Sequence, residues 1–126
     1  MEKVKVAVIG LGGIAQLVHL PNLNKTNGVI VTAVAEINKS RLNAVADKFN
    51  VNERYSDFHE LLKKSDADAV IIATPTNTHK ELAIACLKAG KHVLVEKPLA
   101  RTYQEAKPIA DAAKKYKKII MVGMNL

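Results

Sequence analysis

Short apolar runs alternate with helical patterns along the whole chain, and this alternation limits the fold more than any other feature. The runs are rich in Val, Ile and Ala and are apolar almost throughout, which is typical of strands covered on both faces. No hairpin signal joins one run to the next, so successive strands should be parallel, with a helix crossing between them. We therefore predict an α/β fold with a doubly wound parallel sheet of about six strands, in the order 3-2-1-4-5-6, and helices on both faces. The expected strands span residues 4–9, 29–36, 51–55, 68–74, 91–96 and 118–123.

The segments between these runs carry helix signals. Apolar residues recur at helical spacing, and polar residues that can cap a helix precede two of the segments. Asn38 or Ser40 is expected to cap the second helix, and Ser56 or Asp57 the third. Pro21 is expected to mark a boundary or a kink near the end of the first helix. The expected helices span residues 13–24, 38–50, 58–64, 75–90 and 102–116.

Length and composition indicate one soluble domain. The chain has 126 residues, 48% of them hydrophobic, which suffices for one core. Its single cysteine, Cys86, cannot form an internal disulfide, so we expect a small buried side chain and a reducing, cytoplasmic setting. No apolar run reaches the roughly 18 residues of a membrane span.

The net charge of +7 raises the question of a nucleic-acid partner. Part of the excess lies in "AAKKYKKII", residues 112–120. Lysines near the C-terminus of a helix also favour its dipole, and a solvated helix end is the more common explanation. We therefore expect neither nucleic acid nor membrane as a partner, and note that a basic surface also attracts an anionic dinucleotide.

A glycine loop follows the first strand, in "VAVIGLGGIAQ". Gly10 would allow a tight turn, Gly12 would let the backbone approach a diphosphate, and Ala15 is small enough for close helix–strand packing. With Gly13 and Ile14, these residues open the helix whose N-terminal N–H groups would face the phosphates. The pattern is weak alone, but it occurs here between a strand and a helix, the context that dinucleotide binding requires. The alternative is a glycine turn without a ligand.

An acid at the end of the second strand completes this pattern. Glu36 lies 21 residues after Ala15, and its carboxylate could accept hydrogen bonds from ribose hydroxyls. The same charge would repel a 2′-phosphate, which favours NAD over NADP. Lys39, Ser40 and Arg41 follow closely and could instead bind that phosphate, so NADP remains an alternative. A solvated strand end is the other interpretation of Glu36.

Four motifs follow one another along the chain: "VIGLGGIAQ", "ATPTNTH", "AGKHVLVEKPLA" and "VGMN". In their order and spacing they resemble the dinucleotide-binding half of the glucose–fructose oxidoreductase/inositol dehydrogenase (Gfo/Idh/MocA) family, which has a Rossmann fold. The resemblance covers essentially the whole chain, and "GKHVLVEKP" is its most specific part.

The resemblance implies roles for the residues that end the fifth strand. Lys97 matches the family's active-site lysine, beside the reacting substrate oxygen and the nicotinamide. Glu96 matches an acid beside the nicotinamide ribose, and the Lys97–Pro98 bond is expected to be cis. Asn125 matches the "GxN" position near the nicotinamide end.

The resemblance also implies that the loop after the fourth strand lines the cofactor. Thr74, Pro75, Asn77 and His79 occupy the matching positions. The other three histidines, at positions 19, 59 and 92, belong to no motif, and we expect them to be structural. They lack the spacing of metal ligands, so no metal site is expected.

Taken together, these features predict the NAD(P)-binding domain of an oxidoreductase. A parent enzyme would transfer hydride between the cofactor and a sugar, inositol or similar hydroxyl or carbonyl compound. The resemblance implies a following substrate domain, which also carries most oligomer contacts. Residues 1–126 would then be the cofactor half, inactive alone and prone to self-associate. The alternative is a stand-alone regulatory or sensor module that binds NAD without turnover.

Overall fold

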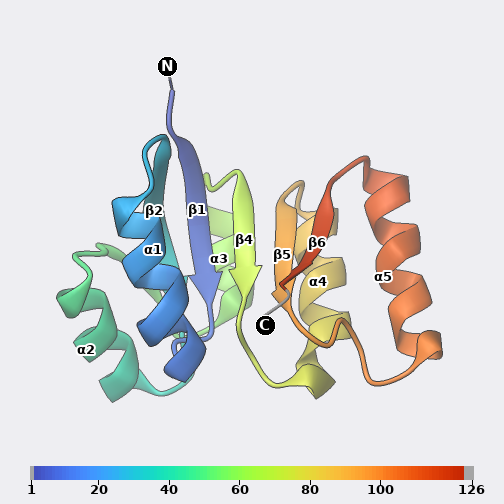
Figure 1. Ribbon diagram of the computed structural model, residues 1–126, viewed down its shortest axis with the longest axis horizontal. Coiled ribbons are helices and arrows are strands. Elements are labelled where there is room, and N and C mark those ends of the chain that lie inside the picture. The colour runs from blue at the N-terminus through green and yellow to red at the C-terminus, as the bar shows by residue number, and fades with distance from the viewer. Residues whose placement is uncertain (1, 124–126) are drawn as a thin grey trace.

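The computed structural model describes residues 2–123. Its elements alternate between strands and helices from end to end (Figure 1). The strands are β1 Val4–Ile9, β2 Val29–Ala35, β3 Glu53–Tyr55, β4 Ala69–Ile72, β5 His92–Glu96 and β6 Ile120–Gly123. The helical elements are η1 Ala15–His19, α1 Leu20–Lys25, α2 Lys39–Lys48, α3 Phe58–Lys64, η2 Thr76–Thr78, α4 His79–Lys88 and α5 Tyr103–Tyr116.

The strands form one six-stranded sheet in the order β3-β2-β1-β4-β5-β6. Every neighbouring pair is parallel. The order reverses between β1 and β4, because the chain builds outward from β1 in one direction and then from β4 in the other. The predicted doubly wound sheet is therefore confirmed, and ligands of such sheets bind beyond the carboxyl ends of the strands at this reversal.

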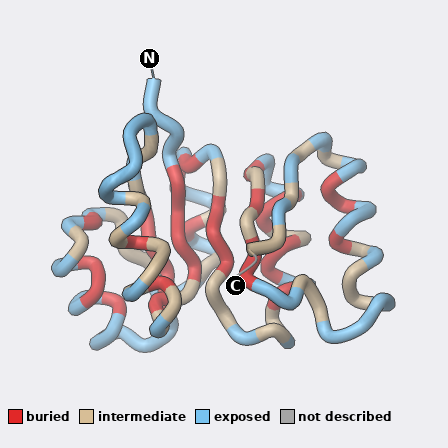
Figure 2. Tube along the Cα trace, viewed as in Figure 1, coloured by how far each residue is buried: buried red, intermediate tan, exposed pale blue. Residues whose placement is uncertain are grey.

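Two apolar cores lie on opposite faces of the sheet. The first joins η1, α1 and α2 to the strands through side chains such as Leu20 and Val45. The second joins α3, α4 and α5 to the other face through Leu61, Leu87 and Ile109. Buried positions follow the strands and the inward turns of the helices, as Figure 2 shows. On the face that α1 covers, no helix lies in front of β5 and β6 within the described part of the chain (Figure 1).

Side-chain caps fix where α2 and α3 begin. The Asn38 side chain accepts from the N–H of Arg41 at 3.0 Å and caps α2. Asp57 accepts from the N–H of His59 at 2.9 Å and caps α3. Of the capping alternatives that the sequence left open, the structure selects these two, because each precedes its helix in an extended conformation.

The first helix differs from the regular α-helix expected from the sequence. Residues Ala15–His19 form a π-helical turn, and the N–H of Leu20 donates to the carbonyl of Ala15. Pro21 follows at the start of α1. Proline has no N–H to donate within a helix, and the wider turn directly before it changes the hydrogen-bond pattern at that point. The helix therefore continues through Pro21.

Candidate functional site

A cavity of about 530 Å³ opens where the carboxyl ends of β1, β2 and β4 meet. Parallel strands bring these ends to one edge of the sheet, so loops far apart in sequence share the cavity wall. The wall is mainly apolar, with a few polar and charged groups, as is common in small-molecule sites. Its lining residues are Ile9, Gly10, Gly12, Ala35, Glu36, Ile37, Arg41, Ser56, Phe58, Ala73, Thr74, Pro75, Thr78, Glu81 and Leu82.

Two glycines shape the loop after β1 for different reasons. Gly10 has a φ of +94°, and a Cβ there would lie 2.5 Å from the carbonyl oxygen of Ala73. The loops after β1 and β4 therefore approach more closely than any side chain would permit. Gly12 is different, because apart from Gly12 and its two chain neighbours no heavy atom of residues 2–123 lies within 4 Å of the place a Cβ would take. The backbone at Gly12 thus faces open space beside the cavity.

The residues after Gly12 connect the loop to the first helix. Gly13 is exposed, and the place of its missing Cβ is also open among the described residues. Ile14 is half-buried, and Ala15 is fully buried in the core under α1. Ala15 leaves no exposed surface, so a larger side chain there would have to displace its neighbours in the core.

Glu36 ties the end of β2 to the glycine loop. One carboxylate oxygen, Oε1, accepts from the N–H of Leu11 at 3.0 Å, and Oε2 accepts from the N–H of Asn38 at 2.9 Å. The side chain is 6% exposed, and Arg41 Nη1 lies 3.6 Å from Oε1. A carboxylate oxygen can accept more than one hydrogen bond, so each retains capacity toward a ligand hydroxyl. Arg41 also lines the cavity, and both Lys39 and Arg41 are exposed.

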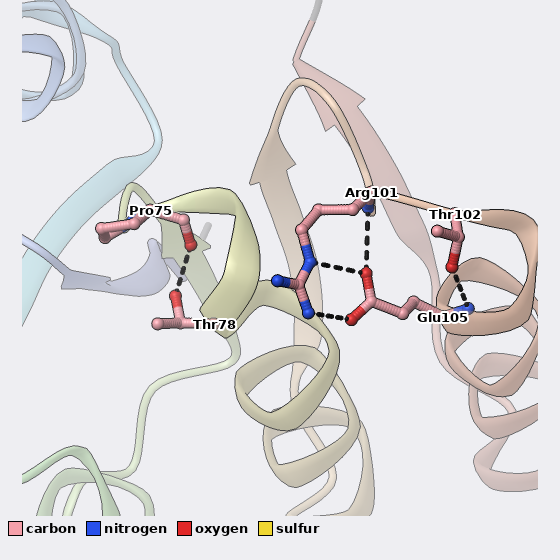
Figure 3. A network of polar contacts seen from close by, with 5 residues as sticks. All are labelled: Pro75, Thr78, Arg101, Thr102 and Glu105. Atoms are coloured by element: carbon pink, nitrogen blue, oxygen red, sulfur yellow. Dashed lines mark hydrogen bonds and ion pairs between the residues drawn. The ribbon is translucent and has the colours of Figure 1, made fainter.

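The loop after β4 is ordered by its own threonines. Thr78 Oγ1 donates to the carbonyl of Pro75 at 2.6 Å, as Figure 3 shows. Thr74 Oγ1 lies 2.6 Å from Thr78 Oγ1. Thr74 is half-buried, whereas Pro75 and Asn77 are exposed. These contacts fix the turn of η2, so the cavity wall formed by Thr74, Pro75 and Thr78 is held by local hydrogen bonds.

His79 is buried between two loops. Its ring is 1% exposed, with Nδ1 at 2.9 Å from the carbonyl oxygen of Pro98 and Nε2 at 2.9 Å from that of Thr74. His79 is not one of the described residues that line the cavity. The ring therefore joins the loop after β4 to the loop after β5 and supports the cavity wall from behind.

The end of β5 carries Glu96 and Lys97 in different surroundings. Glu96 is 9% exposed, and its Oε1 contacts Nε2 of His19. Lys97 is exposed, and the Lys97–Pro98 bond is cis. Sequence reasoning treated His19 as structural and missed this contact. The only signals were its place on the first helix and the sheet order, which brings that helix toward the end of β5.

An arginine–glutamate pair then fixes the start of α5. Arg101 Nη2 donates to Glu105 Oε2 at 2.7 Å, and Arg101 Nε donates to Oε1 at 3.1 Å (Figure 3). Thr102 caps the helix by accepting from the N–H of Glu105 at 3.2 Å. The hydrogen bonds from Arg101 lower the pKa of the Glu105 carboxyl. The chain after Pro98 is thereby anchored directly before α5.

Several predicted features lie elsewhere or outside the described residues. Asn125 falls outside residues 2–123. Cys86 is fully buried in α4, where burial raises the pKa of its thiol to about 12. Within residues 2–123, no three His, Cys, Asp or Glu side chains gather as metal ligands would. The helices described there are also too short or too polar to cross a membrane.

The fold and site define a dinucleotide-binding domain of the Rossmann class. A doubly wound sheet, a glycine loop after β1 and an acid at the end of β2 meet at one cavity. The chain belongs to the Gfo/Idh/MocA oxidoreductase family, because the model of its NAD-binding Rossmann fold matches residues 4–124. The predicted family and the predicted NAD-binding domain are thereby confirmed.

Individual relatives agree with this assignment. Myo-inositol 2-dehydrogenase of Thermotoga maritima is 38% identical over 121 residues, which are 96% of this chain and 36% of the relative. The WlbA dehydrogenase of Chromobacterium violaceum, solved with NADH and UDP-GlcNAcA, superposes with a TM-score of 0.93 at 31% identity. The superposition covers 98% of this chain and 35% of the WlbA chain. KijD10, a 3-ketoreductase of Actinomadura kijaniata solved with NADP, superposes with a TM-score of 0.91 at 32% identity. The superposition covers 97% of this chain and 37% of the KijD10 chain. This chain thus spans about a third of the length of these relatives.

Proposed function

We propose that this chain is the cofactor-binding part of an NAD(P)-dependent oxidoreductase acting on a sugar, an inositol or a similar hydroxyl or carbonyl compound. The observation that carries the proposal is the hydrogen bond from Leu11 to Glu36 at the cavity. It places a buried carboxylate and the open backbone of Gly12 on one wall. A ribose and a diphosphate need these two features side by side.

The residues present fit a nicotinamide dinucleotide. The backbone at Gly12 and Gly13 has open space beside it for a diphosphate, and the first helix begins directly after it. Glu36 can accept from the adenosine ribose hydroxyls while keeping its bonds to the backbone. Glu96 and Lys97 would lie toward the nicotinamide end. The cofactor, when bound, supplies the hydride acceptor or donor.

The charges around the ribose position favour NAD over NADP. The Glu36 carboxylate is buried, so little water screens its repulsion of a 2′-phosphate. Arg41 is nearby, but its guanidinium lies 3.6 Å from Glu36 and is already attracted to it. We therefore expect Glu36 to dominate, although NADP is bound by the related KijD10.

We assign to Lys97 the transfer of the substrate's hydroxyl proton. When hydride leaves a carbinol carbon, its hydroxyl must also lose a proton, and a positioned group must accept or relay it. The Lys97 side chain is exposed at the end of β5, next to the buried Glu96. In the reverse direction, an ammonium there would polarise the carbonyl and return the proton to its oxygen.

The relatives support a proposal about the substrate, and the chain's share of about a third of their length supports one about a further domain. Myo-inositol 2-dehydrogenase and a 3-ketoreductase are among the proteins that the chain resembles. We propose a polyol or sugar-like substrate held by a following domain that also mediates homo-oligomer contacts. The lone Cys86 agrees with a cytoplasmic enzyme.

Turnover with Lys97 variants tests this function. In the complete protein, Lys97→Ala should lower NADH production from inositols and sugars at least about 100-fold, as expected for loss of an acid–base group. Cofactor affinity should change far less. Lys88 is also exposed but lies on α4. Lys88→Ala is therefore the matched control and should retain full activity.

The 126-residue chain alone should bind cofactor and show no turnover, because orientation of the substrate supplies much of the rate. Lys97-dependent NADH production by this chain would contradict the assignment of substrate binding to another domain. Cofactor binding without turnover by the complete protein on any polyol or sugar would instead support a regulatory module.

A further inference from the structure

A contact between His19 and Glu96 joins the two halves of the sheet. His19 belongs to the first helix, which follows β1, whereas Glu96 ends β5. β4 lies between β1 and β5, so the contact passes over the point where the strand order reverses. It connects residues 77 positions apart in sequence.

The local backbone explains how the two side chains meet. His19 is the last residue of the π turn Ala15–His19, whose extra residue per turn changes the direction of the side chains that follow. On β5, Leu94 and Glu96 share one face because side chains alternate along a strand. Leu94 packs against the core under α1, so Glu96 lies on the same side of the sheet as His19.

The Glu96 carboxylate is confined in this position. Its side chain is 11% exposed and that of His19 13%. Gly123 pairs with Glu96 in the sheet, and a Cβ there would lie 3.5 Å from Oε2. An ionised carboxylate can only accept hydrogen bonds, so a hydrogen bond to ionised Glu96 requires the His19 tautomer that carries its hydrogen on Nε2. The contact therefore holds one carboxylate oxygen and leaves the other beside Gly123.

We propose that His19 is a positioning residue for the nicotinamide end of the cofactor. It holds Glu96, and through the adjacent backbone Lys97, in register with the glycine loop at the start of its own helix. The inference rests on the proposed cofactor binding. Loss of the contact should then weaken the binding of a complete dinucleotide. The binding of a ligand confined to the glycine loop and Glu36 should be unaffected.

Two ligands and a set of His19 variants test this proposal. NADH spans both ends of the site, whereas ADP carries only the adenosine and diphosphate part. By calorimetry, His19→Ala should bind NADH about tenfold more weakly, since a bond to a buried carboxylate is lost. Its affinity for ADP should stay within about twofold of wild type, a difference near the precision of such comparisons.

Conservative variants separate positioning from structure. The amide nitrogen of Gln reaches about as far from the backbone as Nε2 of His, whereas that of Asn is shorter. His19→Gln should therefore restore NADH affinity and His19→Asn should not. Leu17→Ala, in the same π turn but 80% exposed, controls for effects on the helix itself.

Each other outcome overturns the proposal. Unchanged NADH affinity in His19→Ala would show that the contact does not position the site. Equal losses for NADH and ADP would indicate a general effect on the glycine loop. If wild type bound ADP but not NADH, or bound neither ligand, the proposed cofactor itself would be wrong. Wild type alone would reveal that failure, without the His19 variants. Should His19→Ala fail to fold, the Gln and Asn variants make the same comparison.

Discussion

The backbone N–H of Leu11 donates to Oε1 of Glu36 at 3.0 Å, so the end of β2 holds the glycine loop after β1. Glu36 is buried, and its second oxygen accepts from Asn38, the cap of α2. The acid at the ribose position therefore also organises the protein. Its substitution should affect both the choice of cofactor and the order of the loop.

Glu36→Ser should narrow the preference for NAD over NADP. Removing the carboxylate removes its repulsion of a 2′-phosphate and leaves Arg41 without that partner. We expect wild type to bind NAD at least about tenfold more tightly than NADP, and the variant to reduce this ratio severalfold. Calorimetric titration with both cofactors measures it, and Glu60→Ser, an exposed acid on α3, is the control. A wild-type preference for NADP would mean that Lys39 and Arg41 dominate.

The strand order could be predicted because it depends on features that are local in sequence. Apolar runs without hairpin signals require crossover helices, and the glycine loop after the first run indicates where the sheet begins to wind. Glu36 was identifiable because it lies at a fixed distance from Ala15. Its two backbone partners were not, because their positions depend on how the β2–α2 turn folds.

The contacts between distant segments could not be predicted in the same way. The π turn that ends at His19 leaves no clear signal besides Pro21, and its partner Glu96 is 77 residues away. The resemblance assigned His79 to the loop after the fourth strand, and the structure places it at the first residue of α4. Only the structure shows that its ring is buried between the carbonyls of Thr74 and Pro98.

Cys86 should make the protein less stable at alkaline pH. Burial raises the pKa of the thiol from 9.0 to about 12 in the folded state. Above pH 9 the unfolded thiol therefore loses its proton while the folded thiol keeps it, which favours unfolding. The free energy of unfolding should fall by up to about 1.4 kcal/mol per pH unit from this group.

Urea unfolding of wild type and Cys86→Ala at pH values on both sides of 9 checks this effect. The variant should be less stable at neutral pH, because it loses a buried sulfur atom and leaves a small cavity, but should show the shallower alkaline decline. Equal declines would show that the thiol ionises as readily in the folded state as in the unfolded state.

The face of β5 and β6 that no described helix covers should promote self-association. Ile119 is 62% exposed and Met121 59% exposed, and Met121 lies beside Leu94 in the sheet. Adjacent exposed apolar side chains favour contact with another apolar surface. Light scattering of the 126-residue chain should show association that increases with concentration. Met121→Lys should weaken it, whereas Leu17→Lys, on the first helix and even more exposed, should not.

Gly12→Val tests the central claim that the glycine loop binds a nicotinamide dinucleotide. The backbone at Gly12 has open space beside it, so a valine there should be compatible with folding and would occupy the place of the diphosphate. Gly10→Ala provides the contrast, since its Cβ would lie 2.5 Å from a backbone oxygen at a φ of +94°. That variant should lose about 3 kcal/mol of stability, whereas Gly12→Val should unfold close to wild type.

The decisive measurement is calorimetric titration of NAD into wild type and into folded Gly12→Val. We expect saturable binding to wild type, with a loss of well over tenfold in the variant, or more than about 1.4 kcal/mol. Equal affinity in the two folded proteins would contradict the account, because the cofactor would then bind elsewhere than at the loop between β1 and the first helix.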